Sequence, residues 1–123
     1  MAKPTLEQQR AKDAWRKSGG CCREYMTLAK ALPGLIMNSG LMQTMAFLHQ
    51  KGGGKSSNHH RKLAEDLRSW LSERFPGEVK EDFEEFMYGL MKADPRTYQD
   101  ITVEAMAWLR WMRQMAAARC GDD

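Results

Sequence analysis

Valine and isoleucine are nearly missing from this chain of 123 residues, which has two of each. β-Branched residues favour strands, so their scarcity argues against a β-sandwich, a β-barrel and an α/β nucleotide-binding enzyme. Met, Leu, Ala, Glu, Lys and Arg dominate instead, which favours helices. The sequence therefore predicts an all-α fold. We expect a single compact domain over residues 1–123, a bundle of about five to seven helices.

Long apolar runs are also missing. The first ten residues contain no apolar core of a secretory signal, and the stretch 28–48 is interrupted by Lys30 and Pro33. We therefore expect a cytoplasmic protein without membrane contact. The three cysteines are an odd number, and Cys21 and Cys22 are adjacent. This pattern predicts reduced cysteines in place of a disulfide framework.

Residues that could build an active site or a metal centre are scarce. All three histidines lie in or beside the segment 49–62, and none has a zinc-type spacing to the cysteines. The run 51–56 lacks the glycine spacing of a nucleotide-binding phosphate loop, and no strand is expected before it. We predict no catalytic residue, no metal site and no cofactor.

Charge is unevenly divided along the chain, although the formal net charge is only +3. Residues 1–62 contain 11 Lys and Arg against 3 Asp and Glu, a net charge of +8. Residues 63–123 contain 8 against 13, a net charge of −5. A basic surface suits nucleic acid, and an acidic one suits a protein neighbour or the basic end of a second copy. Chance charge blocks on helices explain the asymmetry about equally well.

Apolar residues recur at helical spacing along most of the chain. Thr5, with Gln8 three residues later, predicts the start of a first helix. A second helix is expected to break at Pro33 and Gly34. A basic loop rich in Gly, Lys and His is expected at 49–62, because consecutive glycines oppose helix formation. Later helical stripes fall at 63–75, 79–91 and 101–115, with caps at Asn58 and Asp94.

A specific pattern appears between residues 32 and 48. It combines a Leu-Pro pair, an Asn, a Gly-Leu pair, a Gln and an Ala-Phe-Leu run, and the basic loop follows it. The matching residues are Leu32, Pro33, Asn38, Gly40, Leu41, Gln43, Ala46, Phe47 and Leu48. This order resembles the signature of the small-subunit family of the Cmr complex, the type III-B CRISPR effector that silences foreign RNA.

Later stretches resemble the same family, namely a helix ending in Trp70-Leu71 and a closing helix at 98–111. The resemblance covers nearly the whole chain. It implies a non-catalytic subunit that stacks in several copies beside the crRNA-binding backbone and helps to hold guide and target RNA. The implied partners are the backbone and large subunits of the Cmr complex, further copies of the chain, crRNA and target RNA.

Such a subunit needs positive charge, because base pairing reads the sequence while the protein contacts phosphates. The first candidates for RNA binding are the cations around the loop, where glycines let backbone amides approach phosphate: Lys51, Lys55, Arg61 and Lys62. Further candidates lie near the expected second helix: Arg16, Lys17 and Arg23.

Candidate subunit-interface residues lie in the second half of the chain. Trp111 and Met115 widen the apolar face of the last helix. Glu81, Glu84 and Glu85 form an acidic cluster at the start of a helix, where they also complement the helix dipole. Contact between basic and acidic parts of successive copies would be heterologous and could propagate along a filament.

The signature residues have a structural interpretation as well. Asn38 and Gly40 suit a tight corner between helices, and Gln43 suits a cap of that corner. Pro33 and Phe47 then belong to the same structural signature. In this interpretation the pattern identifies the fold more than an RNA site.

Two alternative functions stay open. The small subunit of a type III-A effector would differ in its partners more than in its role. A small helix-turn-helix DNA-binding protein would need an exposed recognition helix with base-reading side chains, whereas the most basic segment here is an expected loop.

Overall fold

The computed structural model describes residues 2–53 and 58–120, and within them it contains six helices and no strand. This confirms the predicted all-α bundle. The helices are α1 (Leu6–Lys17), α2 (Arg23–Ser39), α3 (Leu41–Gly52), α4 (His59–Arg74), α5 (Phe83–Lys92) and α6 (Pro95–Cys120).

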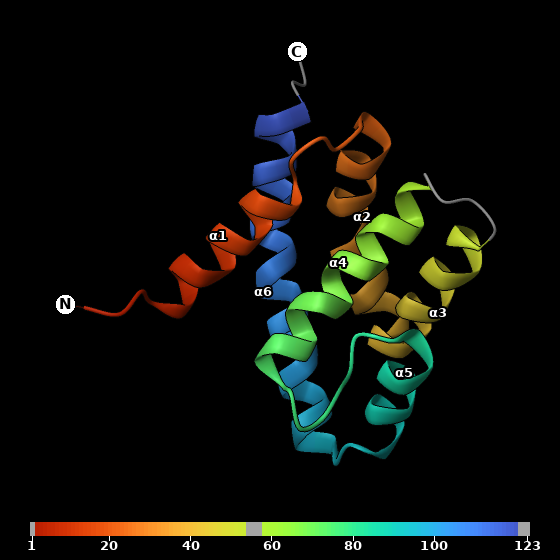
Figure 1. Cartoon of the computed structure of the whole chain (residues 1–123). Helices are drawn as coiled ribbons and strands as arrows, with labels where there is room; N and C mark the ends of the chain where they lie inside the picture. Colours follow the sequence, from red (N-terminus) through yellow and green to blue (C-terminus); the bar gives the residue numbers. More distant parts are fainter. Residues whose placement is uncertain (1, 54–57, 121–123) are drawn as a thin grey trace.

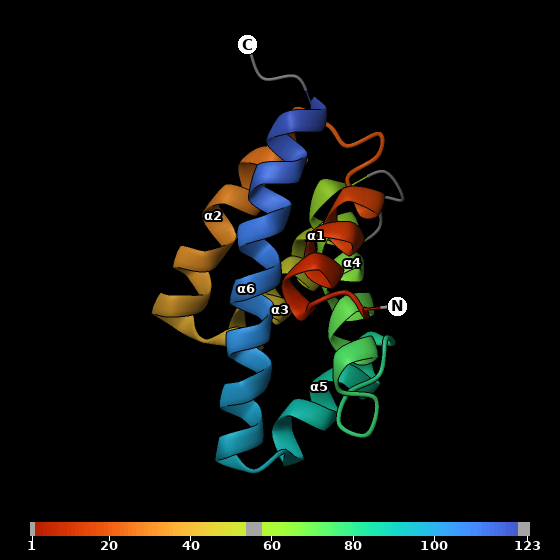
Figure 2. The ribbon, with the colours of Figure 1, turned by 90° about the vertical axis from the view of Figure 1, so that its left-hand side faces the viewer.

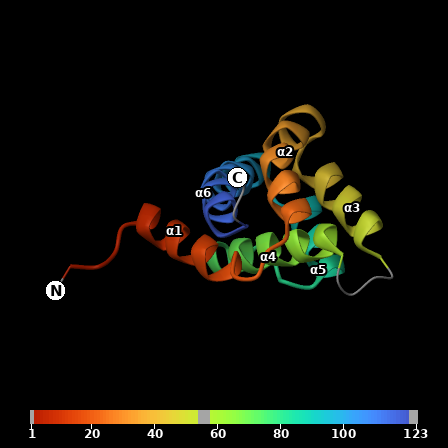
Figure 3. The ribbon, with the colours of Figure 1, turned by 90° about the horizontal axis from the view of Figure 1, so that it is seen from above.

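The long helix α6 runs through the length of the molecule, and α1, α2 and α4 pack against it (Figures 1 and 2). Helix α3 packs against α2 and α4, and α5 contacts α3. The start of α1 extends away from the rest of the bundle (Figure 3). The contact between α3 and α4 positions the candidate site, because it brings together the two ends of the basic segment 49–62.

Polar side chains begin the helices where the sequence predicted them. The Thr5 hydroxyl accepts a hydrogen bond from the Gln8 backbone N–H, and the Gln8 side chain accepts one from the Thr5 N–H. Asn58 and Asp94 likewise accept backbone N–H groups in the first turns of α4 and α6. These bonds satisfy donors that a helix start otherwise leaves unpaired, which is why the boundaries are readable from sequence.

Helix α2 continues through Pro33, so the predicted break there is wrong. A proline inside a helix costs about 3 kcal/mol because it cannot donate the backbone hydrogen bond. The flanking residues Leu32 and Ile36 are buried, and α2 packs against α3, α4 and α6. Burial of this apolar face outweighs the local cost. The helix instead ends at Gly40, whose φ of 87° favours glycine.

The predicted loop at 49–62 is shorter than expected. Residues 49–52 form the last turn of α3, and 59–62 form the first turn of α4. Gly52 stays helical because the two helices cross there, and a Cβ on it would lie 2.8 Å from the Arg61 Cα. This close packing outweighs the cost of a helical glycine, about 1 kcal/mol. Lys55 lies outside the described residues.

The prediction that all cysteines are reduced is also wrong. Cys21, just before α2, is joined in a disulfide to Cys120, the last residue of α6, with 6.0 Å between their Cα atoms. Cys22 is free and exposed, and its sulfur accepts a hydrogen bond from the Tyr25 N–H at the start of α2. The pairing was hidden in the sequence because 99 residues separate the partners.

Three carboxylates are buried within the bundle, each against an aromatic donor. Asp13 accepts a hydrogen bond from Trp108 Nε1, Asp66 from the Tyr25 hydroxyl, and Glu104 from Trp70 Nε1, with donor–acceptor distances of 2.8, 2.7 and 3.0 Å. Buried charges are tolerated when they are paired and hydrogen-bonded. All three carboxylates also pair with Lys or Arg side chains, which reduces the positive charge left on the surface.

Candidate nucleic-acid interface

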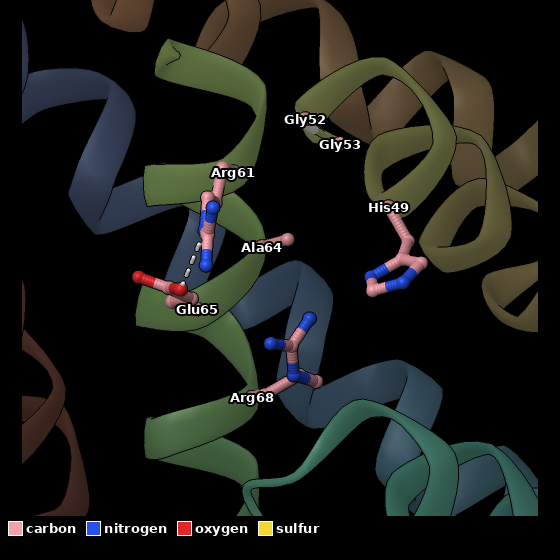
Figure 4. A pocket seen from close by; sticks show the side chains of 7 residues that line it. All are labelled: His49, Gly52, Gly53, Arg61, Ala64, Glu65 and Arg68. Carbon is pink, nitrogen blue, oxygen red and sulfur yellow. Dashed lines mark hydrogen bonds and ion pairs between the residues drawn. The ribbon is translucent and has the colours of Figure 1, made fainter. Parts of the chain in front are cut away.

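A pocket of about 270 Å³ lies where the end of α3 meets the first half of α4 (Figure 4). We call it the α3–α4 pocket. Its lining combines part of the basic segment with residues from further along α4: His49, Gly52, Gly53, Arg61, Ala64, Glu65 and Arg68.

The backbone around the pocket is held by close contacts between α3 and α4. Gly52 packs directly on the Arg61 backbone, with no room for a side chain between them. On the other side of the connection, the Asn58 side-chain amide donates a hydrogen bond of 2.9 Å to the Lys51 carbonyl. These contacts hold the backbone at the two helix ends, from which Arg61 and His49 project on facing sides of the pocket (Figure 4).

One wall of the pocket is aromatic. The His49 ring stacks on Phe83, the first residue of α5, with 3.7 Å between ring centroids and planes 5° apart. The Arg68 guanidinium lies over the same Phe83 ring, 5.7 Å from its centroid. Phe83 therefore orients the His49 imidazole by stacking on it. The same Phe83 ring packs against the Arg68 guanidinium in a favourable cation–π arrangement.

Arg68 is the buried cation of the pocket, with 8% of its surface exposed. Its Nε donates a hydrogen bond of 2.8 Å to the Glu81 carbonyl. Nη1 is fully buried and has no partner, and neither Nη nitrogen makes a hydrogen bond to a described residue. Burial lowers the pKa of this guanidinium. A guanidinium can donate two parallel hydrogen bonds to a carboxylate or a phosphate, and here two nitrogens remain unused.

Arg61 is the second cation of the pocket. Its Nε lies 3.2 Å from a Glu65 carboxylate oxygen, one helical turn along α4, and both side chains are about half exposed. An exposed pair of this kind contributes about 0–1 kcal/mol, so it can exchange partners at little cost. Arg61 was predicted from the sequence. Arg68 was missed, although its position four residues after Ala64, on the apolar stripe of α4, marks an unusual cation.

Lys51 is exposed beside the pocket, and its Nζ lies 6.0 Å from the centroid of the Phe47 ring. The His60 ring also makes an edge contact with Phe47, with 5.9 Å between ring centroids. Burial lowers the pKa of His60, and nearby His59 and Lys51 lower it further. Of the loop candidates, Arg61 lines the pocket and Lys51 is exposed next to its lining residue Gly52. We call Lys51 and the pocket-lining residues together the α3–α4 surface.

The other predicted cations are largely occupied by the buried carboxylates. Lys17 Nζ lies 2.9 Å from Asp13, and Lys62 Nζ lies 2.6 Å from Asp66. Arg16 also pairs with Asp13, at 2.9 Å. Burial raises the pKa of Asp66, while its hydrogen bond from Lys62 opposes that rise. The basic half of the sequence therefore leaves less positive charge for a ligand than its residue count indicates.

Arg23 lies apart from the pocket, at the start of α2. It is exposed and lines a groove of about 360 Å³ together with Glu24 and His59. The structure therefore does not bring Arg23 together with Lys51 and Arg61.

Comparison with known proteins identifies the family. Residues 6–119 match a family described as CRISPR-associated protein (Cas_Cmr5). The chain belongs to the Cmr5 family. The Thermus thermophilus CRISPR system Cmr subunit Cmr5 is 30% identical over 95 residues, which cover 77% of this chain and 74% of that protein.

Two further comparisons agree. The Thermotoga maritima CRISPR system Cmr subunit Cmr5 is 30% identical over 99 residues, 80% of this chain and 65% of that relative, slightly under two thirds of its length. An X-ray crystal structure of a Cmr5 family protein from Thermus thermophilus superposes with a TM-score of 0.74 at 26% identity. That superposition covers 94% of this chain and 97% of the other.

The Cmr5 signature residues lie around the corner between α2 and α3. Gly40 makes the turn, and the Tyr98 hydroxyl from α6 accepts a hydrogen bond of 3.3 Å from the Met42 N–H just beyond it. Asn38 and Gln43 are exposed. The expectation that Gln43 caps the corner is wrong, because its side chain makes no hydrogen bond in the described part of the chain.

The predicted interface residues occupy two separate regions. Trp111 and Met115 are half-buried on α6, and Trp111 lines a shallow pocket with Glu7, Arg110 and Arg113. Glu81, Glu84 and Glu85 are exposed around the start of α5. This acidic cluster adjoins the α3–α4 pocket, because the Glu81 backbone carbonyl accepts the hydrogen bond from Arg68 and the Glu81 charge also acts on that guanidinium.

Within residues 2–53 and 58–120, no group of three or more His, Cys, Asp or Glu side chains could hold a metal ion. Among the same residues no helix has the length and apolar character needed to cross a membrane.

Proposed function

We propose that this chain is the small subunit of a type III-B CRISPR Cmr effector complex and that it acts without catalysing a reaction. The observation that carries the proposal is the Cmr5 family match over residues 6–119, supported by the similarity in fold to a Cmr5 family protein. The match favours this function over a type III-A subunit or a helix-turn-helix DNA-binding protein. Its partners are the backbone and large subunits, further copies of the chain, crRNA and target RNA.

In this role the α3–α4 surface contacts RNA phosphates. Lys51 is exposed there, and Arg61 and Arg68 line the adjoining pocket. Phosphate contacts need no sequence specificity, because pairing between guide and target supplies it. Binding through a few cations is weak and dependent on salt, so the contribution of one subunit grows when several copies lie along the same RNA.

The proposal is tested by purifying the tagged full chain from its native host. Bound proteins are identified by mass spectrometry, and bound nucleic acid is sequenced. We expect Cmr subunits and short crRNAs to copurify with the chain. Recovery of DNA, or of the chain alone at native expression, would refute the assignment.

Trp111→Ala is expected to weaken assembly of the complex more than folding of the chain. Trp111 is half-buried at the rim of a shallow pocket, so part of its apolar surface is available to a neighbour. Copurification of Cmr subunits and thermal unfolding of the isolated chain measure the two effects. Tyr88→Ala, which removes an aromatic ring that is 62% exposed on α5, serves as the control. A lower melting temperature with unchanged copurification would contradict the interface role.

A further inference from the structure

We propose that the α3–α4 pocket is a binding site for a single phosphate group, supplied by the RNA backbone, with Arg68 as its central ligand and Arg61 as the second. The identity of the donor as RNA rests on the proposed function. The existence of an oxyanion site rests on the pocket itself, whose lining contains both guanidiniums.

The first argument is the unsatisfied state of Arg68. Its side chain is more than nine-tenths buried, its Nε is occupied by the Glu81 carbonyl, and its two Nη nitrogens make no hydrogen bond to a described residue. A buried guanidinium without a hydrogen-bonded anion is costly, because desolvation is not repaid. A phosphate in the pocket would supply acceptor oxygens for these nitrogens.

The second argument is the geometry around Arg68. Figure 4 shows its guanidinium directed along α4 into the space between Ala64 and His49. Phe83 packs against the guanidinium and His49, which limits their movement. Arg61, two turns earlier on α4, reaches the same pocket from the third position of that helix. The positive end of the α4 dipole lies at this end of the helix.

Glu65 is the carboxylate of the pocket lining that competes with the proposed ligand, and the charges of Asp82 and Glu81 also act on Arg68. Its carboxylate lines the pocket and now holds Arg61 at 3.2 Å. A phosphate would replace the Glu65 carboxylate as the partner of Arg61, and the negatively charged carboxylate would then repel the phosphate. Removing the charge of Glu65 should therefore strengthen phosphate binding. A purely structural role for the Arg61–Glu65 pair would give no such gain.

The test uses the full ¹⁵N-labelled chain and inorganic phosphate, added at constant ionic strength and followed by NMR of the arginine Nε–H groups. We expect saturable shifts at Arg68 and Arg61 with millimolar affinity. Glu65→Gln should tighten binding by about threefold, as expected for the loss of one nearby like charge in a solvated site. Arg68→Gln should abolish the saturable shifts. Arg110→Gln, which removes an exposed cation from α6, should leave the affinity unchanged.

A short oligouridylate, titrated into the same samples, distinguishes an RNA phosphate from free phosphate. We expect it to shift the same arginine signals and to compete with inorganic phosphate. Equal or weaker phosphate affinity in Glu65→Gln would overturn the site, even if Arg68→Gln failed to fold. Phosphate binding without any oligouridylate effect would overturn the assignment to RNA. Absence of Cmr subunits from the native purification would instead refute the proposed function and leave the phosphate result standing.

Discussion

Glu104→Ala is expected to lower the free energy of unfolding by about 3 to 5 kcal/mol, the usual cost of removing one partner from a buried ion pair. Glu104 accepts two hydrogen bonds from the Arg10 guanidinium, at 2.7 and 2.8 Å, and a third from Trp70 Nε1 at 3.0 Å. The substitution leaves the buried Trp70 Nε1 and the largely buried Arg10 guanidinium without their acceptor.

Glu7→Ala is a matched control, because Glu7 pairs with the same Arg10 but its side chain is 63% exposed. We expect this change to cost about 0–1 kcal/mol. Urea unfolding of both variants gives the comparison. A Glu104→Ala loss no larger than that of Glu7→Ala would show that the buried pair does not stabilise the fold.

The acid dependence of stability provides a second readout for Glu104. Burial opposes its ionisation, but hydrogen bonds from Arg10 and Trp70, together with the charges of Arg10 and Arg74, outweigh burial and hold the pKa of Glu104 below its ordinary value. A lowered folded-state pKa adds stability above the unfolded-state pKa, and this stability is lost as the pH falls through the folded value. The native chain should therefore lose more stability below about pH 4.5 than Glu104→Gln does.

Gly89→Ala is expected to lower the free energy of unfolding by about 2 to 3 kcal/mol, the cost of overpacking a buried position. Gly89 lies inside α5, where alanine would ordinarily be the better helix former. A Cβ there would collide with the Glu78 carbonyl oxygen and would approach Val79 Cγ1 to 3.2 Å. Because the obstacle is backbone, it cannot move aside as a flexible side chain would.

Gly34→Ala provides the control with the opposite sign. Gly34 is also helical, in α2, but it is exposed, and a Cβ added to it would meet no neighbour within 4 Å. Alanine should therefore stabilise the chain by about 0.5–1 kcal/mol through its helix propensity. Thermal and urea unfolding measure both changes. Similar effects of the two substitutions would contradict the close approach of α5 to the turn before it.

The agreement between sequence and structure is best where helix boundaries depend on neighbouring residues. Thr5, Asn58 and Asp94 begin helices because their side chains accept N–H groups two or three positions away. Such bonds require nothing from the rest of the molecule. The predicted break at Pro33 failed, and the predicted loop at 49–62 was too long, for the converse reason, since packing of α2 and α3 against other helices outweighs the local preference.

The candidate site was only partly predictable. Glycine and lysine content pointed to the segment that contains Lys51 and Arg61. The sequence did not indicate that Lys62 pairs with Asp66, or that Arg68 joins the same pocket. Counting charges along the chain treats each cation as available, whereas buried carboxylates neutralise several of them. Roles of the predicted RNA-binding residues remain predictions that the titrations above can test.

The helical class, the caps and the family resemblance are properties of composition, periodicity and short motifs, so they can be read from the order of residues. Three other features depend on which helices lie side by side. They are the link between Cys21 and Cys120, the Arg10–Glu104 pair across 94 residues, and the close approach of Gly52 to Arg61. Local hydrogen bonds form within a few residues, but contacts between different helices arise only when burial of the whole core brings those helices together.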